Sequence, residues 1–419
     1  MRKKRKRGSA LVWVAVVLAV AAAVVASLSG GVGYPEDAEK TASTSPDVPD
    51  RDISVAPTGP ELTPTPSPTA TIPPPTVTPS ESEAPSPAES VSAPLVMTVA
   101  VGGDVLPAGR IGAKIESGEY DAVLDADTAA RLRAADVTMI NLETSVSVRG
   151  EPIPEKAYTF RSPPENLKFI TDWLGADVVS IANNHTLDYG WDAFHDTLAH
   201  LDEYGIAHIG AGESLSEAAR PYIVGSEGVR IAFFAANQIL TYANWAAGTD
   251  KPGQLIAREA KNLGALGDAM AQVRDECDYI VVYMHWGIEL DALPYERQTE
   301  VAHALIDAGA DVVIGAHPHV IQSFEYYNSK PIIYSIGNFL FNSLHPDTAV
   351  VFLRFDAAEP SVTVEVMPAR TEGTLTRAID DSDGRRRLFD YWESISPGVL
   401  FDDDGIMSPA TADISFVTA

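Results

Sequence analysis

Side chains that can bind metal ions follow five expected β-strands of this sequence, each where the strand ends. They are carboxylates, amides and imidazoles, in the motifs Gly102-Gly103-Asp104, Asn141-Leu142-Glu143, Asn183-Asn184-His185, His285-Trp286-Gly287 and Gly315-Ala316-His317-Pro318-His319. Because ligands bind at the carboxyl ends of strands in α/β sheets, we expect these groups to converge on one crevice. The sequence therefore predicts a site of two carboxylates, one or two amides and four imidazoles.

Oxygen and imidazole ligands without a thiolate suit Mn²⁺, Fe or Zn²⁺. Carboxylates shared between two ions let them sit about 3.5 to 4 Å apart, and such a pair activates a water and stabilises both the attacking and the leaving oxygen. A two-metal site with oxygen and imidazole ligands is typical of phosphoester hydrolysis. A lone strand-end carboxylate more often caps a helix, and a lone strand-end histidine is usually structural, so the argument depends on the ordered set.

The order Gly-Asp, Asn-His, a single His after a strand, and then Gly-x-His-x-His resembles the motif set of calcineurin-like metallophosphoesterases. The forms Asn-Leu-Glu, Asn-Asn-His-Thr-Leu-Asp-Tyr-Gly, His-Trp-Gly-Ile-Glu, Gly-Ala-His-Pro-His-Val and Ser-Ile-Gly-Asn-Phe resemble its CapA branch, named for poly-γ-glutamate capsule synthesis. The resemblance covers roughly residues 95 to 345. It implies an α/β fold, an α/β/β/α sandwich of two mixed sheets flanked by helices.

The resemblance also implies a role for each matching residue, with two divalent ions (Mn, Fe or Zn) as cofactors. The implied metal ligands are Asp104, Glu143, Asn184, His285, His317 and His319. Glu143 would bridge the ions, and His185 would be the general acid that protonates a leaving oxygen or binds the attacked group. Asp188 either orients His185 or caps the helix expected to begin near residues 189 to 191.

Three further positions near these motifs have no single predicted role. Glu289 and Asn338 match family positions without a role that the residues themselves suggest. Trp286 either stacks on a substrate or packs in the core, with packing favoured. In the His-Pro-His motif, alternation along an extended chain would turn His317 and His319 to one face.

One position departs from the phosphatase pattern. The usual Asp-x-His places a second ligand two residues after the aspartate, whereas this chain has Leu106 there. One of the two metal positions would then lack a ligand, which would leave it weaker, mononuclear or empty. This departure puts phosphatase activity itself in doubt.

Short β-branched runs alternate with amphipathic stretches from Leu95 onward, as expected for βα units. The expected strands are 95–101, 137–140, 178–181, 230–236, 279–284, 312–314 and 331–336, and 350–355 with 361–367 as an antiparallel pair. The expected helices are 166–174, 191–204, 258–276 and 296–308. Beyond Thr371 the chain is charged and rich in Gly and Asp, and the pattern indicates no particular fold.

The N-terminus has the order of a membrane anchor. Six basic residues at positions 2–7 precede an uncharged apolar run from Ala10 to Ala26. About 20 residues of helix span a bilayer, and basic residues stay in the cytoplasm, so the rest of the chain would lie outside. A single-pass protein of the cytoplasmic membrane is favoured over secretion after signal cleavage, for which residues 24–26 roughly resemble a cleavage site. The sole cysteine, Cys277, lies far from a lipid-attachment position.

Five segments follow from these observations. They are a basic cytoplasmic region (1–9), an anchor or signal peptide (10–29), a disordered Pro/Ser/Thr-rich linker (30–94), a CapA-like domain (95–370) and an acidic C-terminal extension (371–419). The linker holds 15 of the 30 prolines and too few apolar residues for a core, which suits a semi-rigid stalk.

Charge and motifs narrow the functions. A net charge of −28 disfavours nucleic-acid binding, and no Gly-x-x-x-x-Gly-Lys-Ser/Thr loop is present for ATP-dependent ligation. Two hypotheses remain: a metal-dependent hydrolase acting on an envelope polymer or phosphoester, and a non-catalytic component of a membrane polymer-synthesis or export complex that binds an anionic chain through metal. Because an acidic domain repels a polyanion, bound cations would be needed in either case.

Overall fold

The computed structural model describes residues 96–226, 228–260, 263–341 and 345–410. The predicted basic region, anchor and linker, residues 1 to 94, lie outside this range, and so do residues 411–419. Within the described ranges, no helix combines the length and the apolar character needed to cross a bilayer.

The larger of two main sheets is mixed, and the structure places ten strands in it. Along the sheet these are β19 (Val399–Phe401), β20 (Ile406–Pro409), β17 (Glu359–Glu372), β16 (Asp347–Asp356), β1 (Val96–Val105), β2 (Val137–Leu142), β5 (Val178–Ser180) and β6 (Ala207–Ile209), with β15 (Asn338–Leu340) beside β1 and β18 (Leu375–Ala378) beside β17. Strands β1, β2, β5 and β6 are parallel, whereas β16 to β20 pair antiparallel.

The second sheet has six strands in the described residues. Their order is β13 (Phe324–Tyr327), β14 (Lys330–Ile333), β12 (Val312–Ala316), β11 (Tyr279–His285), β9 (Val229–Asn237) and β8 (Tyr222–Ser226). The four central strands are parallel and both edge strands are antiparallel. Two small pairs complete the strands: β3 (Ser145–Val146) with β4 (Arg161–Ser162), and β7 (Ala211–Gly212) with β10 (Gly253–Gln254).

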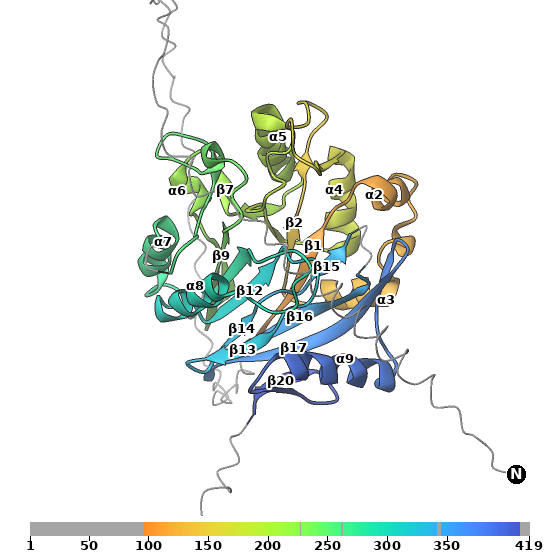
Figure 1. Cartoon of the computed structure of the whole chain (residues 1–419), viewed down its shortest axis with the longest axis vertical. Coiled ribbons are helices and arrows are strands. Elements are labelled where there is room, and N and C mark those ends of the chain that lie inside the picture. The colour runs from red at the N-terminus through yellow and green to blue at the C-terminus, as the bar shows by residue number, and fades with distance from the viewer. Residues whose placement is uncertain (1–95, 227, 261–262, 342–344, 411–419) are drawn as a thin grey trace, which may run out of the picture. The chain divides into compact units, whose positions relative to one another are not determined.

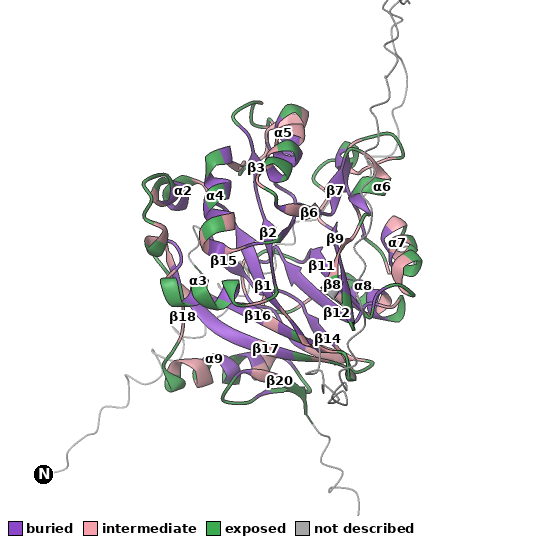
Figure 2. Cartoon of the chain, turned by 180° about the vertical axis from the view of Figure 1, so that it is seen from behind, coloured by how far each residue is buried: buried purple, intermediate pink, exposed green. Residues whose placement is uncertain are grey.

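The two main sheets pack face to face, with helices on both outer faces (Figure 1). One outer face carries α2 (Gly109–Glu116), α3 (Ala126–Arg133), α4 (Leu167–Phe169) and α5 (Gly190–Glu203), and the other carries α6 (Leu215–Ala218), α7 (Ala265–Val273) and α8 (Glu296–Asp307). Alternation along the strands divides their side chains: Val101 and Phe233 lie between the sheets, and Ile140 and Ile280 lie under helices. The strands are buried and the exposed surface falls mainly on helices and loops (Figure 2). The α/β/β/α layering implied by the resemblance is therefore present.

Most predicted elements form close to their expected bounds, with two informative differences. Of the helix predicted at 258–276, the described residues contain α7, which begins after Gly264. This glycine has φ +57°, a non-helical backbone conformation that favours glycine. The helix predicted at 166–174 is a composite of a 3₁₀ turn (Pro164–Asn166), α4 and a π-helical turn (Ile170–Leu174) that ends at Gly175 with φ +80°. Two further 3₁₀ turns, Tyr120–Ala122 and Ala243–Trp245, were not predicted.

Residues after Thr371, for which the sequence indicated no fold, are part of the sandwich. Strands β18 and β20 pair with β17, and α9 (Ser382–Ile395) packs over one end of the core between the sheets. Trp392 of α9 contacts Phe324 and Phe401 at ring-centroid distances of 5.8 and 6.0 Å. Each such aromatic side chain contributes about 1.5–3 kcal/mol of burial free energy, so this segment stabilises the domain.

Candidate metal centre

The carboxyl ends of strands from both sheets meet at one place. Asp104 is the penultimate residue of β1, Glu143 follows β2, and His285 is the last residue of β11. The turn after β5 carries Asn184 and His185, and the loop after β12 carries the two histidines of the His-Pro-His motif. Tyr283 donates a hydrogen bond from its hydroxyl to the Gly102 carbonyl at 3.1 Å, which ties the second sheet to the first beside the site.

Glycines allow the backbone to approach closely at two of these strand ends. A Cβ at Gly103 would lie 1.9 Å from the Gly337 carbonyl oxygen, which accepts the Asp104 N–H at 3.1 Å. A Cβ at Gly315 would lie 2.1 Å from the Tyr334 carbonyl oxygen. Both glycines therefore have a steric reason to be present in the motifs.

His317 and His319 reach the site by a different route from the predicted one. Strand β12 ends at Ala316, and His317 and His319 adopt φ values of +99° and +59°. The prediction that strand alternation turns both rings to one face was wrong, because the chain turns sharply here instead of staying extended. A positive φ costs a non-glycine residue roughly 1–3 kcal/mol and persists where surrounding contacts enforce it. The two ring centroids lie 5.9 Å apart.

Two sets of three donors can each hold a metal ion, and they share Glu143. The first ligand group is Glu143, His285 and His317, and the second ligand group is Asp104, Glu143 and His319. Within each group the ligand atoms lie within 4.8 Å of one another. All six predicted ligands are thus in one place, since the Asn184 Oδ1 atom lies 2.8 Å from His285 Nε2.

Unpartnered atoms in the first ligand group fit a cation. Both carboxylate oxygens of Glu143 and the Nδ1 atom of His317 are buried and have no hydrogen-bond partner among the described residues. Burial raises the pKa of Glu143 well above its usual range, and the nearby Asp104 carboxylate raises it further. A buried carboxylate without a partner costs roughly several kcal/mol, and a bound cation removes that cost. The donor set present therefore fits a divalent metal ion.

The three imidazoles of these groups differ in charge. Burial lowers the pKa of His317 to about 3, and it lowers that of His285 well below the usual range, with further lowering by the His317 ring. Burial acts the same way on His319, but the hydrogen bond with Asp104 and the charge of Glu143 outweigh it and raise the pKa to about 10. Neutral imidazoles are ready metal ligands, whereas His319 must lose a proton first.

Hydrogen bonds from two asparagines that the prediction did not single out as site residues hold the ligands in place. Asn141 donates from its amide to Asp104 Oδ1 at 2.8 Å and contacts His285 Nδ1 at 3.3 Å. Asn183 donates to the Asn141 side-chain oxygen at 3.2 Å. Both residues stand inside the motifs quoted above, so the signal was present in the sequence, but only the structure shows what they contact. Such partners orient metal ligands and tune their basicity.

His185 and Asp188 form a hydrogen-bonded pair at the edge of the site. His185 Nδ1 lies 2.6 Å from Asp188 Oδ2, and its Nε2 lies 3.8 Å from Glu143 Oε1. The capping alternative for Asp188 is wrong, because Tyr189 occupies the N-cap of α5 and makes no side-chain capping bond. Burial lowers the pKa of His185, and the Asp188 carboxylate opposes that shift.

A lysine that sequence reasoning missed joins this pair. Lys156 forms an ion pair with Asp188 and donates to the Asn184 carbonyl oxygen at 2.6 Å. Lys156 lies in a loop without a metal-binding motif, so no pattern pointed to it.

The remaining predicted positions fall as follows. Leu106 directly follows β1 and is buried, and its side chain has no atom that can bind a metal ion. Trp286 is fully buried and donates its indole N–H to the Tyr334 carbonyl at 2.8 Å, which is the core role favoured above. Asn338 Oδ1 accepts a hydrogen bond from the Nδ1–H group of His319 at 2.8 Å. Glu289 is exposed on the loop after β11.

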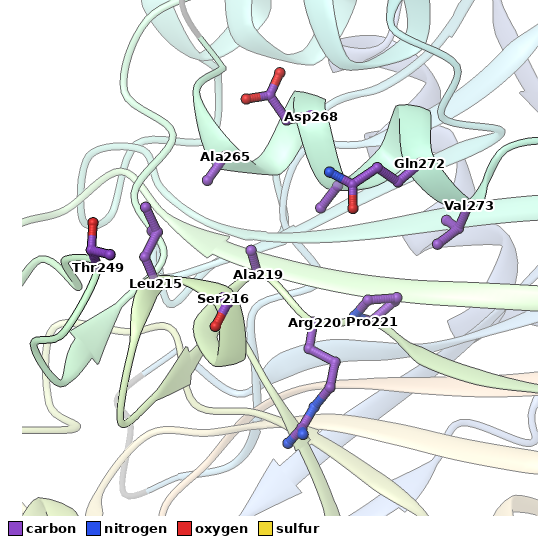
Figure 3. Close-up of a pocket in the computed structure, with 11 residues that line it drawn as sticks. Leu215, Ser216, Ala219, Arg220, Pro221, Thr249, Ala265, Asp268, Gln272 and Val273 are labelled. Atoms are coloured by element: carbon purple, nitrogen blue, oxygen red, sulfur yellow. The ribbon is translucent and has the colours of Figure 1, made fainter.

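A groove elsewhere on the surface contains none of these residues. It lies between α6 and α7, has a volume of about 500 Å³ and is lined by Leu215, Arg220, Asp268 and Gln272 among others (Figure 3).

The sequence of this chain matches the family model described as "Bacterial capsule synthesis protein PGA_cap" over residues 98–343. This chain belongs to the PGA_cap family. The matched range includes every strand that carries a candidate ligand, and the family resemblance drawn from the motifs is confirmed.

Curated relatives agree with this membership of the PGA_cap family. The chain is 36% identical over 211 residues to a "Probable polyglutamine synthesis accessory protein" of Mycobacterium tuberculosis, covering 49% of this chain and 55% of the relative. It is 33% identical over 214 residues to the "Capsule biosynthesis protein CapA" of Bacillus anthracis (50% and 52%), and 34% over 212 residues to the "PGA biosynthesis protein CapA" of Bacillus subtilis (50% and 54%). The chain spans about half the length of the curated relatives it matches.

Solved structures similar to this PGA_cap chain are more distant. A phosphatase from Mycoplasma pneumoniae has a TM-score of 0.41 and 14% identity, covering 66% of this chain and 95% of the other. The NAD nucleotidase of Haemophilus influenzae has a TM-score of 0.36 and 10% identity, covering 74% and 57%. Scores of this size do not establish a shared fold, so the architecture rests on the strands and layers described above.

Proposed function

We propose that this chain is a metal-dependent hydrolase of the phosphoesterase kind that takes part in the synthesis of a capsule or envelope polymer such as poly-γ-glutamate. The observation that carries this proposal is the buried Glu143, whose two unpartnered oxygens are shared by two ligand groups. A shared carboxylate between two donor sets is the arrangement that a two-metal hydrolase requires.

The candidate ligands divide between two divalent ions of Mn, Fe or Zn. Glu143, Asn184, His285 and His317 would hold one ion, and the second ligand group would hold the other. When bound, such ions supply an activated water and stabilise the charge that develops on a phosphoester. Asn141 and Asn338 hold Asp104 and His319 in orientation through the hydrogen bonds described above.

His185 acts on the leaving group in this proposal. Its Nδ1 proton is held by Asp188, because a carboxylate at 2.6 Å can only accept, and its Nε2 is 3.8 Å from Glu143. Once protonated at Nε2, the ring donates that proton to the leaving oxygen as a general acid. Phe160 stacks on the ring at a centroid distance of 4.1 Å and keeps one face of it away from water.

The proposal also covers the location of the chain and its partners. We propose a single-pass protein of the cytoplasmic membrane with its folded domain outside, or a secreted form after signal cleavage. The substrate would be an anionic polymer or a phosphoester, with no nucleic acid, and a membrane polymer-synthesis complex would be the partner. The names of the relatives support the polymer, and the net charge of −28 supports the exclusion of nucleic acid. Because the chain is acidic, an anionic substrate depends on the bound cations.

Leu106 favours a second candidate function. The second ligand group contains three donors, and Leu106 stands where the related pattern carries a histidine. A protein that holds metal only to bind an anionic chain, as a non-catalytic component of a synthesis or export complex, needs no complete second position.

One experiment separates these two functions. Metal content is measured on the purified full-length chain, and hydrolysis of phosphodiesters and γ-glutamyl peptides is assayed for the unmodified protein, His317→Ala and the control His303→Ala. His303 bonds Glu325 and stacks on Tyr327 away from the ligands, so its variant should behave as the unmodified protein. Stoichiometric metal with activity lost only in His317→Ala supports the hydrolase. Bound metal without turnover of any substrate supports the binding role, and absence of metal contradicts both.

A further inference from the structure

One loop contacts the turn that carries His185 and Asp188. Residues 147–160, between β3 and β4, return to the turn that carries Asn184, His185 and Asp188. Lys156 lies in the middle of this loop, with its side chain 11% exposed. Its ammonium group forms the ion pair with Asp188 Oδ1, donates to the Asn184 carbonyl oxygen at 2.6 Å and lies 3.1 Å from His185 Nδ1.

Two further residues of the same loop hold the same turn. The Phe160 N–H donates to Asp188 Oδ2 at 2.7 Å, and the Ile153 N–H donates to the Asp188 carbonyl oxygen at 2.8 Å. The ring of Phe160 stacks on His185 with an interplanar angle of 27°. The 147–160 loop therefore fixes the position of Asp188. Through Asp188 it also fixes the tautomer and the ring plane of His185.

The charge of Lys156 is already compensated within the protein. Asp188 carries the opposite charge and the Asn184 carbonyl takes a second hydrogen of the ammonium group, so little of its hydrogen-bonding capacity is left for a substrate. What the group does is fix two neighbours: the backbone of Asn184, whose side-chain oxygen faces His285, and the carboxylate that holds His185. This arrangement suits a residue that orders the site more than one that binds a substrate anion.

We propose that Lys156 is a positioning residue of the metal centre: it fastens the 147–160 loop to the Asn184–Asp188 turn, so that Asn184 presents its amide oxygen and His185 its Nε2 atom to the space around Glu143. The inference rests on the metal-binding part of the proposed function. It adds a residue that no motif of the chain contains. Partners that orient a ligand in this way commonly contribute about 10- to 100-fold to metal affinity.

The test measures metal affinity, which requires no turnover. The full-length chain is freed of metal by chelation and titrated calorimetrically with Mn²⁺ and with Zn²⁺, for the unmodified protein, Lys156→Met, Lys156→Arg and the control Lys114→Met. Met has nearly the length of Lys without its charge, and Lys114 pairs with Glu119 on the surface. We expect Lys156→Met to weaken binding about 10- to 100-fold, Lys156→Arg to weaken it less, and Lys114→Met to leave it unchanged.

A second readout follows the histidine itself. In the metal-free protein, the imidazole ¹⁵N shifts of His185, assigned with a His185→Gln variant, should report a proton on Nδ1, and Lys156→Met should shift the ring toward the mixed tautomers of a free imidazole. Unchanged metal affinity together with an unchanged His185 spectrum in Lys156→Met would overturn the inference. So would a variant whose metal affinity and spectrum stay normal while binding of polyglutamate falls, since Lys156 would then contact the substrate.

The two proposals fail in different ways. If the unmodified chain binds neither metal, the proposed function fails, and the His185 spectrum still decides whether Lys156 orders the turn. If Lys156→Met does not fold, Lys156→Gln replaces it, and its thermal unfolding in the metal-free state is compared with that of Lys114→Met. A loss of metal affinity in a variant that unfolds like the control supports positioning, and a loss explained by unfolding contradicts it.

Discussion

The two ligand groups share one carboxylate but differ in how the protein satisfies the rest of their atoms. In the first ligand group, His317 Nδ1 and both oxygens of Glu143 lack hydrogen-bond partners among the described residues. In the second, Asp104 accepts from Asn141 and from the His317 N–H, and it lies 3.5 Å from His319 Nδ1. Glu143 belongs to both groups, so the difference lies in their other ligands. His317 Nδ1 has no hydrogen-bond partner among the described residues, whereas Asp104 and His319 already have partners. We therefore expect an ion to bind more tightly in the first ligand group.

The shared carboxylate should have the largest effect when it is changed. Glu143→Gln removes the one ligand common to both groups, and we expect it to abolish metal retention at both, a loss greater than the ~10- to 100-fold typical of a residue that only orients a ligand. Metal content after dialysis measures this. Gln keeps the size of the side chain without its charge, so the free energy of unfolding of the metal-free variant should lie within about 1 kcal/mol of that of the unmodified protein. Full metal content in Glu143→Gln would refute the shared ligand.

Single changes in each group should separate the two positions. His317→Ala removes a neutral donor of the first ligand group, so the tighter phase of a calorimetric metal titration should disappear. His319→Ala should leave that phase in place and remove only the weaker one. Equal effects of the two variants on the tight phase would contradict the proposed ranking of the groups.

A donor added at Leu106 should make the two groups more alike. Leu106→His restores the residue type of the related pattern beside the second ligand group, and we expect the weaker binding phase to tighten by about tenfold, the lower end of the range for one contact at a metal. Leu106→Gln, with a longer side chain and no imidazole, is the control. An unchanged weak phase in Leu106→His would mean that position 106 does not reach the ion.

Stability of the metal-free protein should respond to pH in opposite directions at the two histidines. The folded pKa of His317, about 3, lies below its unfolded value of 6.5, so the unfolded chain takes up the proton first and His317 lowers stability as the pH falls from 6.5 toward 3. The folded pKa of His319, about 10, lies above 6.5, so its contribution is fully present below 6.5 and is lost as the pH rises toward 10.

Thermal unfolding between pH 4 and pH 10, in the presence of a chelator, measures these two slopes. His317→Ala should flatten the acid side of the profile, and His319→Ala should flatten the alkaline side. If either variant changes the opposite side, the charge states assigned to these rings are wrong.

The sequence predicted which residues gather at the site better than it predicted the contacts between them. Strand-end motifs identify six donors because the carboxyl ends of parallel strands meet at one edge of a sheet. The same reasoning failed for the geometry of His317 and His319, whose positive φ angles break the expected alternation. It also missed Lys156, because a lysine in an irregular loop has no periodicity and no fixed spacing from the residues it contacts.

In the C-terminal segment, too, local patterns predicted some elements of the fold and missed one that depends on distant contacts. Repeating alternation predicted β16 and β17, but α9 lies in a charged stretch and buries only Leu388, Phe389 and Trp392. Its place depends on contacts of these side chains with Phe401 of the next strand and with Phe324, which is far away in the sequence. Short-range patterns report which face of an element is apolar, and they do not report which other element covers it.

The order of motifs by itself determined the family, the layered α/β class and the chemical type of the site, because these depend on residue types at strand ends and on local periodicity. Tertiary structure showed that Glu143, which the resemblance suggested as a bridge, belongs to both ligand groups. It alone showed that the other ligands of the two groups differ in their hydrogen-bond partners, and that Lys156 contacts the turn of His185. Those properties depend on distances between residues far apart in the chain, and burial sets the strength of each charge only after the chain has folded around it.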